Sequence, residues 1–207
     1  MRRSIMASSF LVLPLMAGLA AAARPLVSLL LTDKWLPCVP FLQICCIDFA
    51  FYPIHTANLQ AINAMGRSDV FLKLEIIKKS YGIAILCVTV FCFEGVLPIV
   101  WGAVVSTVIS SFVNAFPNKK LIHYGYWEQI RDILPPIVMS LTMFLAVSAL
   151  GRLPLGNLPL LLVQVAAGVV LYGGMSLLFK PESFRCLVQM AAALRRKAAR
   201  SKGGTEA

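Results

Sequence analysis

Charged residues are scarce in this sequence. Only 14% of its 207 residues are Asp, Glu, Lys or Arg, whereas 59% are hydrophobic. Soluble domains average about 25% charged and 45–50% apolar residues. The composition therefore indicates a membrane protein rather than an ordinary soluble domain.

The residue types that carry catalysis or bind metals are also few. Nine acidic residues and two histidines leave little for paired-carboxylate or imidazole catalysis. None of the six cysteines forms a CxxC pair, so we expect them to pack as small apolar side chains and not to bind a metal. No nucleophile elbow, Walker loop, glycine-rich dinucleotide loop or HExxH motif occurs. We therefore expect neither an enzyme nor a cofactor, and the lack of aromatic residues interleaved with basic ones argues against nucleic-acid binding.

Long apolar runs are abundant, and about 20 such residues span a bilayer. Six runs stand out, at residues 5–31, 37–65, 80–93, 95–116, 133–150 and 155–179. The third is short for a crossing, so the preceding helix is expected to supply its first turn. We predict an all-α polytopic transmembrane helix bundle of about six spans over residues 1–179. Residues 180–207 form a basic cytoplasmic tail, either an amphipathic helix on an anionic leaflet or a disordered segment.

The basic residues predict the orientation of this bundle. All of the 19 lysines and arginines except Arg24, Lys34 and Arg152 fall at the start of the chain, between the second and third runs, between the fourth and fifth, or in the tail. With six spans these segments share one side of the membrane. The positive-inside rule places that side, with both termini, in the cytoplasm.

The first run has a second interpretation. Residues 1–25 have a basic start, an apolar middle and an alanine run, as a cleaved signal peptide does. The apolar stretch resumes after Arg24, which favours a span of about 27 residues. Cleavage would leave five spans without changing the orientation of the others.

Residues 64–80, "AMGRSDVFLKLEIIKKS", concentrate six charges. Gly66 is expected to end one helix and Ser68 to cap the next, with Asp69 in its first turn. Asp69 and Glu75 each precede a lysine by four residues, a spacing that stabilises a helix. We predict an amphipathic lead-in helix at the cytoplasmic surface.

The second run is unusually polar. It contains Gln60 and five further polar side chains that, at about 100° per residue, fall within roughly 140° of arc, although Pro53 should bend the helix. The arc contains Asp48, Tyr52, His55, Asn58 and Asn63. Such a face either lines a cavity for a hydrophilic substrate or makes hydrogen bonds between helices. Arg24, late in the first run, either reaches the outer interface or binds an anion in a cavity.

Residues 32–82, "TDKWLPCVPFLQICCIDFAFYPIHTANLQAINAMGRSDVFLKLEIIKKSYG", resemble the bacterial polysaccharide biosynthesis and O-antigen flippase family. This family belongs to the multidrug, oligosaccharidyl-lipid and polysaccharide exporter superfamily. The resemblance rests on "DKW", then "YPIHTANLQAI", then "GRSD" and "LKLEIIKK". It covers about a quarter of the chain. The motif is specific when the whole run is taken together, whereas any short piece of it is a weak signal.

The resemblance implies a carrier that moves an undecaprenyl-diphosphate-linked glycan across the bacterial inner membrane by alternating access, as in lipopolysaccharide synthesis. Its partners would be this lipid-linked glycan and membrane lipids, and no covalent chemistry is required. Cations in a central cavity would hold the diphosphate and sugar acids. Mapped by pattern, the substrate-binding residues would be Arg24, Asp48, His55, Asn58, Arg67 and Lys73.

The chain departs from this family in size, because family members have roughly twice as many spans arranged in two lobes. It resembles the C-terminal portion, so we expect a truncated product, a fragment, or one part of an assembly with an N-terminal half or another subunit. The alternatives are a non-transporting membrane subunit that packs against partner helices, and a small multidrug-type exporter.

Overall fold

The computed structural model describes residues 1–121 and 124–190, and in these ranges the chain is helical with no strand. The elements are α1 (Arg2–Ala21), α2 (Ala23–Leu31), the 3-10 helix η1 (Asp33–Cys38), α3 (Val39–Ala50), α4 (Tyr52–Ala64), α5 (Ser68–Cys92), α6 (Leu97–Leu121), α7 (Tyr126–Leu150) and α8 (Asn157–Phe179). Residues 182–190 are also helical. The predicted all-α helix bundle is confirmed.

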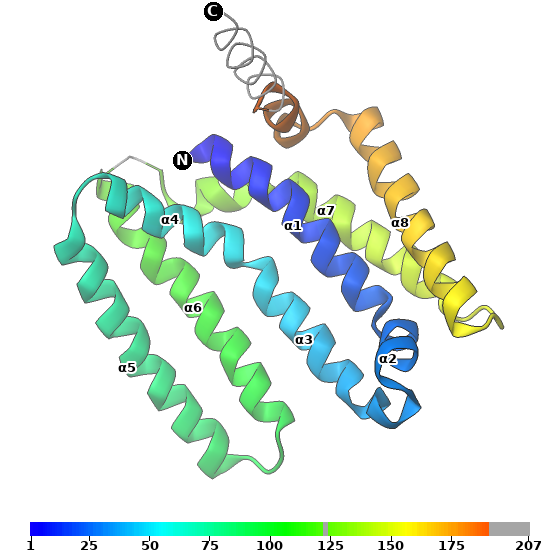
Figure 1. Ribbon diagram of the computed structural model, residues 1–207. Helices are drawn as coiled ribbons and strands as arrows, with labels where there is room; N and C mark the ends of the chain where they lie inside the picture. The colour runs from blue at the N-terminus through cyan, green and yellow to red at the C-terminus, as the bar shows by residue number, and fades with distance from the viewer. Residues whose placement is uncertain (122–123, 191–207) are drawn as a thin grey trace, which may run out of the picture.

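The chain runs back and forth between two ends of the molecule (Figure 1). The first residue, the α4–α5 turn, the end of α6, the start of α7 and the end of α8 lie at one end, which we call the N-terminal end. The α2–η1 segment, the α5–α6 turn and the α7–α8 turn lie at the other, which we call the far end. The most basic connections therefore gather at one end, as the charge pattern predicts.

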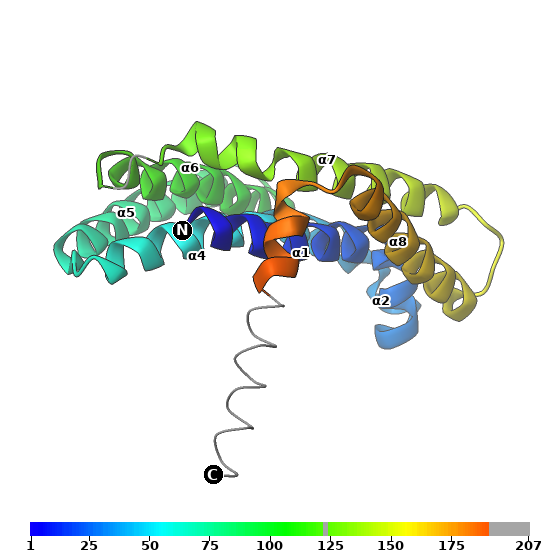
Figure 2. The same cartoon turned by 90° about the horizontal axis from the view of Figure 1, so that it is seen from above.

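Seen from above, the helices form an open, curved array with α5 and α8 at its edges (Figure 2). Helix α1 packs along α7, and this contact holds the core. One buried cluster joins Phe10, Met139, Met143, Val147 and Tyr172, and the Tyr172 hydroxyl donates to the Phe10 carbonyl at 2.9 Å. A second cluster nearer the N-terminal end contains Ile5, Ile54, Ala57 and Ile133.

The first apolar run is divided into two helices, whereas we predicted one. Helix α1 ends at Ala21, and α2 begins at Ala23. Pro25 explains the break, because its nitrogen cannot donate the helical hydrogen bond to residue 21 and its ring crowds the preceding turn. The break places Arg24 in the first turn of α2, at the far end.

The second run is also divided, here by the bend that Pro53 predicts. Phe51 separates α3 from α4, and Pro53 lies in the first turn of α4. Gly66 follows α4 with φ of +67°, a left-handed conformation that glycine adopts without strain. It ends the helix as expected.

The charged segment after Gly66 differs in part from our prediction. The lead-in helix runs directly into the short third run, as expected, and the two form one continuous helix, α5. The N-cap, however, is Arg67 and not Ser68. Asp69 does lie in the first turn, yet its ion-pair partner is Arg67. Glu75 pairs with Lys78, three residues on, rather than with Lys79. Helix α5 lies beside α6 along most of its length (Figure 1).

Five helical segments are long and apolar enough to cross a membrane: Arg2–Ala21, Asp33–Ala64, Leu97–Lys119, Tyr126–Leu150 and Asn157–Phe179. Helix α5 is not among them, because five charged side chains fall in its first twelve residues, 68–79. The sixth span and the orientation remain predictions.

The described part of the tail packs against the helices instead of projecting freely. Phe184 packs against Phe10 in a tilted arrangement, with ring centroids 5.9 Å apart. The Cys186 thiol donates to the Arg3 carbonyl at 3.6 Å, and Ser183 is buried. The predicted surface helix or disordered tail beyond residue 190 lies outside the described residues.

Candidate functional site

The polar side chains of the α3–α4 segment separate into two groups. The outward group, which we call the polar row, has members three or four residues apart on one side of the segment. Its members are half-buried or exposed, with Tyr52 60% exposed. The polar row consists of Asp48, Tyr52, Thr56, Gln60 and Asn63.

The inward group takes part in an amide cluster that joins three helices. Asn58 of α4 and Gln129 of α7 exchange two hydrogen bonds, of 2.8 and 3.0 Å. Asn118 of α6 donates to the same Asn58 Oδ1 at 2.6 Å. All three side chains are fully buried. Because a buried amide needs partners, this cluster fixes α4 against both neighbouring helices.

His55 lies about one turn away and is held by α6. Its Nε2 is 3.2 Å from Ser111 Oγ, and its Nδ1 is 3.0 Å from Asn114 Nδ2. Ser111 in turn donates to the Thr107 carbonyl at 3.1 Å. Asn58 and His55 therefore both make hydrogen bonds between helices, which is one of the two alternatives given for the polar arc. That His55 and Asn58 bind substrate remains a prediction.

Asp48 is the carboxylate of the polar row. It is half-buried in the middle of the α3–α4 segment, and its Oδ1 has no hydrogen-bond partner among the described residues. An ionisable group at such a position usually faces a protein interior or a water-filled cavity. The unpaired Oδ1 is itself buried, so it faces the protein interior, and binding of substrate by Asp48 remains a prediction.

The three predicted cationic residues are not brought together. Arg67 lies at the N-terminal end and donates to Asp69 at 3.1 and 3.2 Å, which lowers the pKa of that carboxyl. Lys73 is exposed near the same end. Arg24 lies at the far end, away from Arg67 and Lys73.

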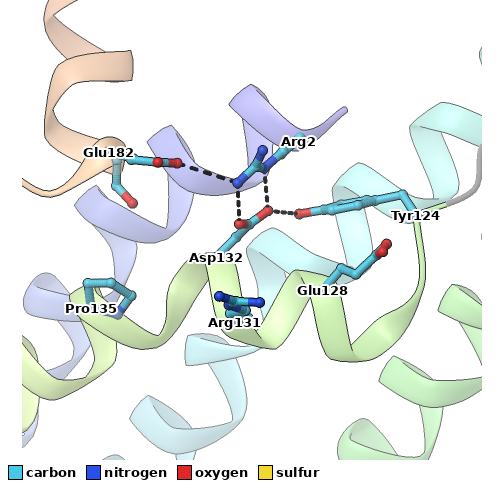
Figure 3. A pocket seen from close by; sticks show the side chains of 8 residues that line it. Arg2, Tyr124, Glu128, Arg131, Asp132, Pro135 and Glu182 are labelled. Atoms are coloured by element: carbon cyan, nitrogen blue, oxygen red, sulfur yellow. Dashed lines mark hydrogen bonds and ion pairs between the residues drawn. The ribbon is translucent and has the colours of Figure 1, made fainter.

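A charged cluster at the N-terminal end was not predicted (Figure 3). Arg2 of α1 donates to both carboxylate oxygens of Asp132 on α7 at 2.7 Å, and to Glu182 after α8 at 3.4 Å. The Tyr124 hydroxyl donates to Asp132 at 2.7 Å. Burial and the negative charge of Asp132 raise the pKa of Tyr124. A cavity of about 600 Å³ adjoins the cluster.

The charges of this cluster are largely satisfied by one another. The Asp132 carboxylate accepts two hydrogen bonds from Arg2 and one from Tyr124, and its side chain is 11% exposed, whereas that of Arg2 is 56% exposed. The cluster therefore links α1 to α7 and to the start of the tail. No sequence pattern pairs residues 130 positions apart, which is why it was missed. Among the described residues no metal-binding group of His, Cys, Asp and Glu is found.

Comparison with protein families gives one match. A family model described as polysaccharide biosynthesis protein matches residues 1–40, which form α1, α2, η1 and the start of α3. Comparison with curated proteins and with solved structures gives no significant match. The matched segment overlaps the motif run quoted above only at residues 32–40.

The family match and the five long apolar helices together support a membrane protein of polysaccharide biosynthesis. The match stops before the polar row and the amide cluster. It agrees with the resemblance on the kind of family, and it carries no information on those residues.

Proposed function

We propose that the chain forms one wall of a carrier for a lipid-linked oligosaccharide precursor in the bacterial inner membrane. The observation that carries this proposal is the polar row, whose members are half-buried or exposed on a segment otherwise apolar enough to cross the bilayer. Polar side chains facing lipid are costly, whereas those facing a water-filled cavity are not. The polar row is therefore assigned to the wall of a hydrophilic passage.

The chemistry of this wall suits a glycan. Tyr52, Gln60 and Asn63 offer hydroxyl and amide groups that hydrogen-bond to sugar hydroxyls. Arg67 and Lys73 lie at the N-terminal end of the molecule, where their charge could hold the diphosphate of the lipid carrier. Transport by this route breaks no covalent bond, so we propose no enzymatic step. The second wall would come from an N-terminal half or another subunit.

Complementation tests the proposal. In cells that lack their own carrier, the chain supplied with an N-terminal half should restore surface glycan. Leucine at both Gln60 and Asn63 should reduce that restoration, since leucine cannot hydrogen-bond to sugar. The matched control is Val88→Leu, on an exposed apolar part of α5, which should restore glycan fully. Failure of the unmodified chain with the second half present would refute the proposal.

The polar row also permits the second candidate function, a non-transporting subunit whose polar groups bond to a partner's helices. A photo-reactive amino acid in place of Tyr52 discriminates between the two, because that side chain is exposed. Adducts with a lipid-linked glycan favour the carrier, and adducts with protein alone favour the subunit. Adducts with neither, only with phospholipid, would contradict both.

A further inference from the structure

A cavity of about 250 Å³ lies between the start of α1 and the described part of the tail, residues 182–190. Helix α1 contributes Arg2, Arg3 and Met6, all within its first two turns. The tail contributes side chains spaced three or four residues apart, so they share one face of its helix. These are Glu182, Arg185, Cys186 and Gln189. We call this cavity the arginine pocket.

The positive charge of the arginine pocket is only partly compensated. Arg2 pairs with Asp132 at 2.7 Å and with Glu182 at 3.4 Å (Figure 3). Arg3 and Arg185 are exposed and form no ion pair with the residues that the structure describes. Three guanidinium groups thus meet two carboxylates, and one positive charge is left over. A phosphodiester carries the single negative charge that would neutralise it.

The side chains of the pocket have the chemistry that binds phosphate. A guanidinium group donates two parallel hydrogen bonds to phosphate oxygens, and the two free arginines approach from different helices. Gln189 adds an amide donor, and no side-chain hydrogen bond to another described residue occupies it. Met6 and Cys186, both buried, line the same cavity and contribute apolar surface.

The position of the pocket indicates the source of the phosphate. Helices α1 and α8 are both long and apolar enough to cross a membrane. The pocket is lined by the first residues of α1 and by a tail helix that begins three residues after α8 ends at Phe179. Helices of this length match the hydrocarbon layer, so their ends lie at the level of the lipid headgroups. The phosphodiesters of lipids are concentrated at that level.

We propose that the arginine pocket binds the phosphodiester of one anionic phospholipid between Arg3 of α1 and Arg185 of the tail. The bound lipid holds the tail against α1, because its phosphate is shared by the two helices. The site has no residue in common with the polar row and does not depend on the carrier function. Neither the family match nor the polar row assigns a ligand to it.

Titration of the purified chain with dihexanoyl phosphatidylglycerol, followed by microscale thermophoresis, tests the site. We expect saturable binding, weakened about tenfold in Arg3→Gln and in Arg185→Gln, the loss for one charge-assisted contact. Arg131→Gln is the matched control, because Arg131 is exposed at the same end but lies at the other cavity. It should leave the affinity unchanged. Glu182→Gln should bind about two- to fivefold more tightly, since it removes an exposed carboxylate from the pocket.

Two further ligands distinguish the lipid from other sources of binding. Dihexanoyl phosphatidylcholine has the same chains and phosphodiester, but its choline cation cancels the net charge, so it should bind more weakly. Inorganic phosphate at the same concentration should not displace phosphatidylglycerol. Equal affinity for the two lipids, displacement by inorganic phosphate, or equal losses in Arg131→Gln and Arg185→Gln would each overturn the proposal.

The Cys186 thiol reports on the tail directly and separates binding from folding defects. It is buried and donates to the Arg3 carbonyl at 3.6 Å, so a thiol reagent reaches it only when the tail leaves α1. In a chain whose other cysteines are alanine, phosphatidylglycerol at about ten times its Kd should slow labelling by N-ethylmaleimide about tenfold. The lipid should have much less effect in Arg185→Gln. Labelling that ignores the lipid, or slows equally in Arg185→Gln, would overturn the proposal. No glycan is present, so either result leaves the carrier function untouched.

Discussion

The amide cluster predicts a large loss of stability for Asn58→Ala. This change removes three bonds between helices: two accepted by Asn58 Oδ1 from Gln129 and Asn118, and one donated by Asn58 Nδ2 to Gln129. Bonds between helices in membranes average about 0.6 kcal/mol, giving about 2 kcal/mol for three. Buried groups left without partners cost about 1–3 kcal/mol each. We expect a loss of about 2–4 kcal/mol.

Reversible unfolding in bicelles measures this free energy. Asn63→Ala is the matched control, because Asn63 is exposed on the same helix and forms none of the side-chain hydrogen bonds found among the described residues. It should change stability by less than about 0.5 kcal/mol. The double variant with Gln129→Ala should lose less than the sum of the single losses, by about 0.5–3 kcal/mol, since the two side chains share bonds.

Two results would refute the reasoning. A loss for Asn58→Ala no greater than for Asn63→Ala would mean that the buried amides contribute no net stability. Additive losses in the double variant would mean that Asn58 and Gln129 do not interact. Either result would remove the basis for treating α4, α6 and α7 as one unit.

Three further predictions concern other sites. Gly66→Ala should cost about 1–2 kcal/mol in unfolding experiments, because φ of +67° strains any residue with a Cβ although nothing lies within 4 Å; Gly66→Asn should cost less. Gly102→Leu should destabilise the α5–α6 pair by about 1–3 kcal/mol, since even a Cβ would lie 2.7 Å from Thr89 Cγ2; an unchanged unfolding free energy would contradict this packing. The Tyr124 phenol should remain protonated above the ordinary tyrosine pKa of about 10, because burial and Asp132 raise its pKa. Its contribution to stability is then complete below that pH and is lost as the pH rises toward the folded-state pKa, a loss that Tyr124→Phe should not show.

Helix type and ends were predictable where local chemistry decides them. Apolar length predicts the long helices, Pro53 the bend between α3 and α4, and Gly66 the end of α4. Pro25 marked a further break, yet the apolar pattern on both sides of it was read as one span. The pattern of side chains alone does not show whether a proline bends a helix or ends it.

The partners of polar side chains were not predictable. The sequence shows that Asn58 and Asp48 lie on a polar arc, but only the packing of α6 and α7 shows that one is enclosed and the other partly open. The pairs Asn58–Gln129 and Arg2–Asp132 join residues 71 and 130 positions apart. The ion pairs near the start of α5 also differ from the predicted ones: Glu75 pairs with Lys78, three residues on, and Asp69 pairs with Arg67 instead of Lys73.

The amide cluster also determines which way the polar row faces. Asn58 and Gln60 are about 200° apart around α4, so the bonds that hold Asn58 inward direct Gln60 outward. In a cysteine-free chain, a charged thiol reagent should label Gln60→Cys much faster than Ile62→Cys, since Ile62 is fully buried. Adding Asn58→Leu releases the helix and should bring the two rates closer together. If the ratio of rates stays unchanged while stability falls, the cluster holds the helices together without setting the direction of the row, and the link between packing and the proposed passage is lost.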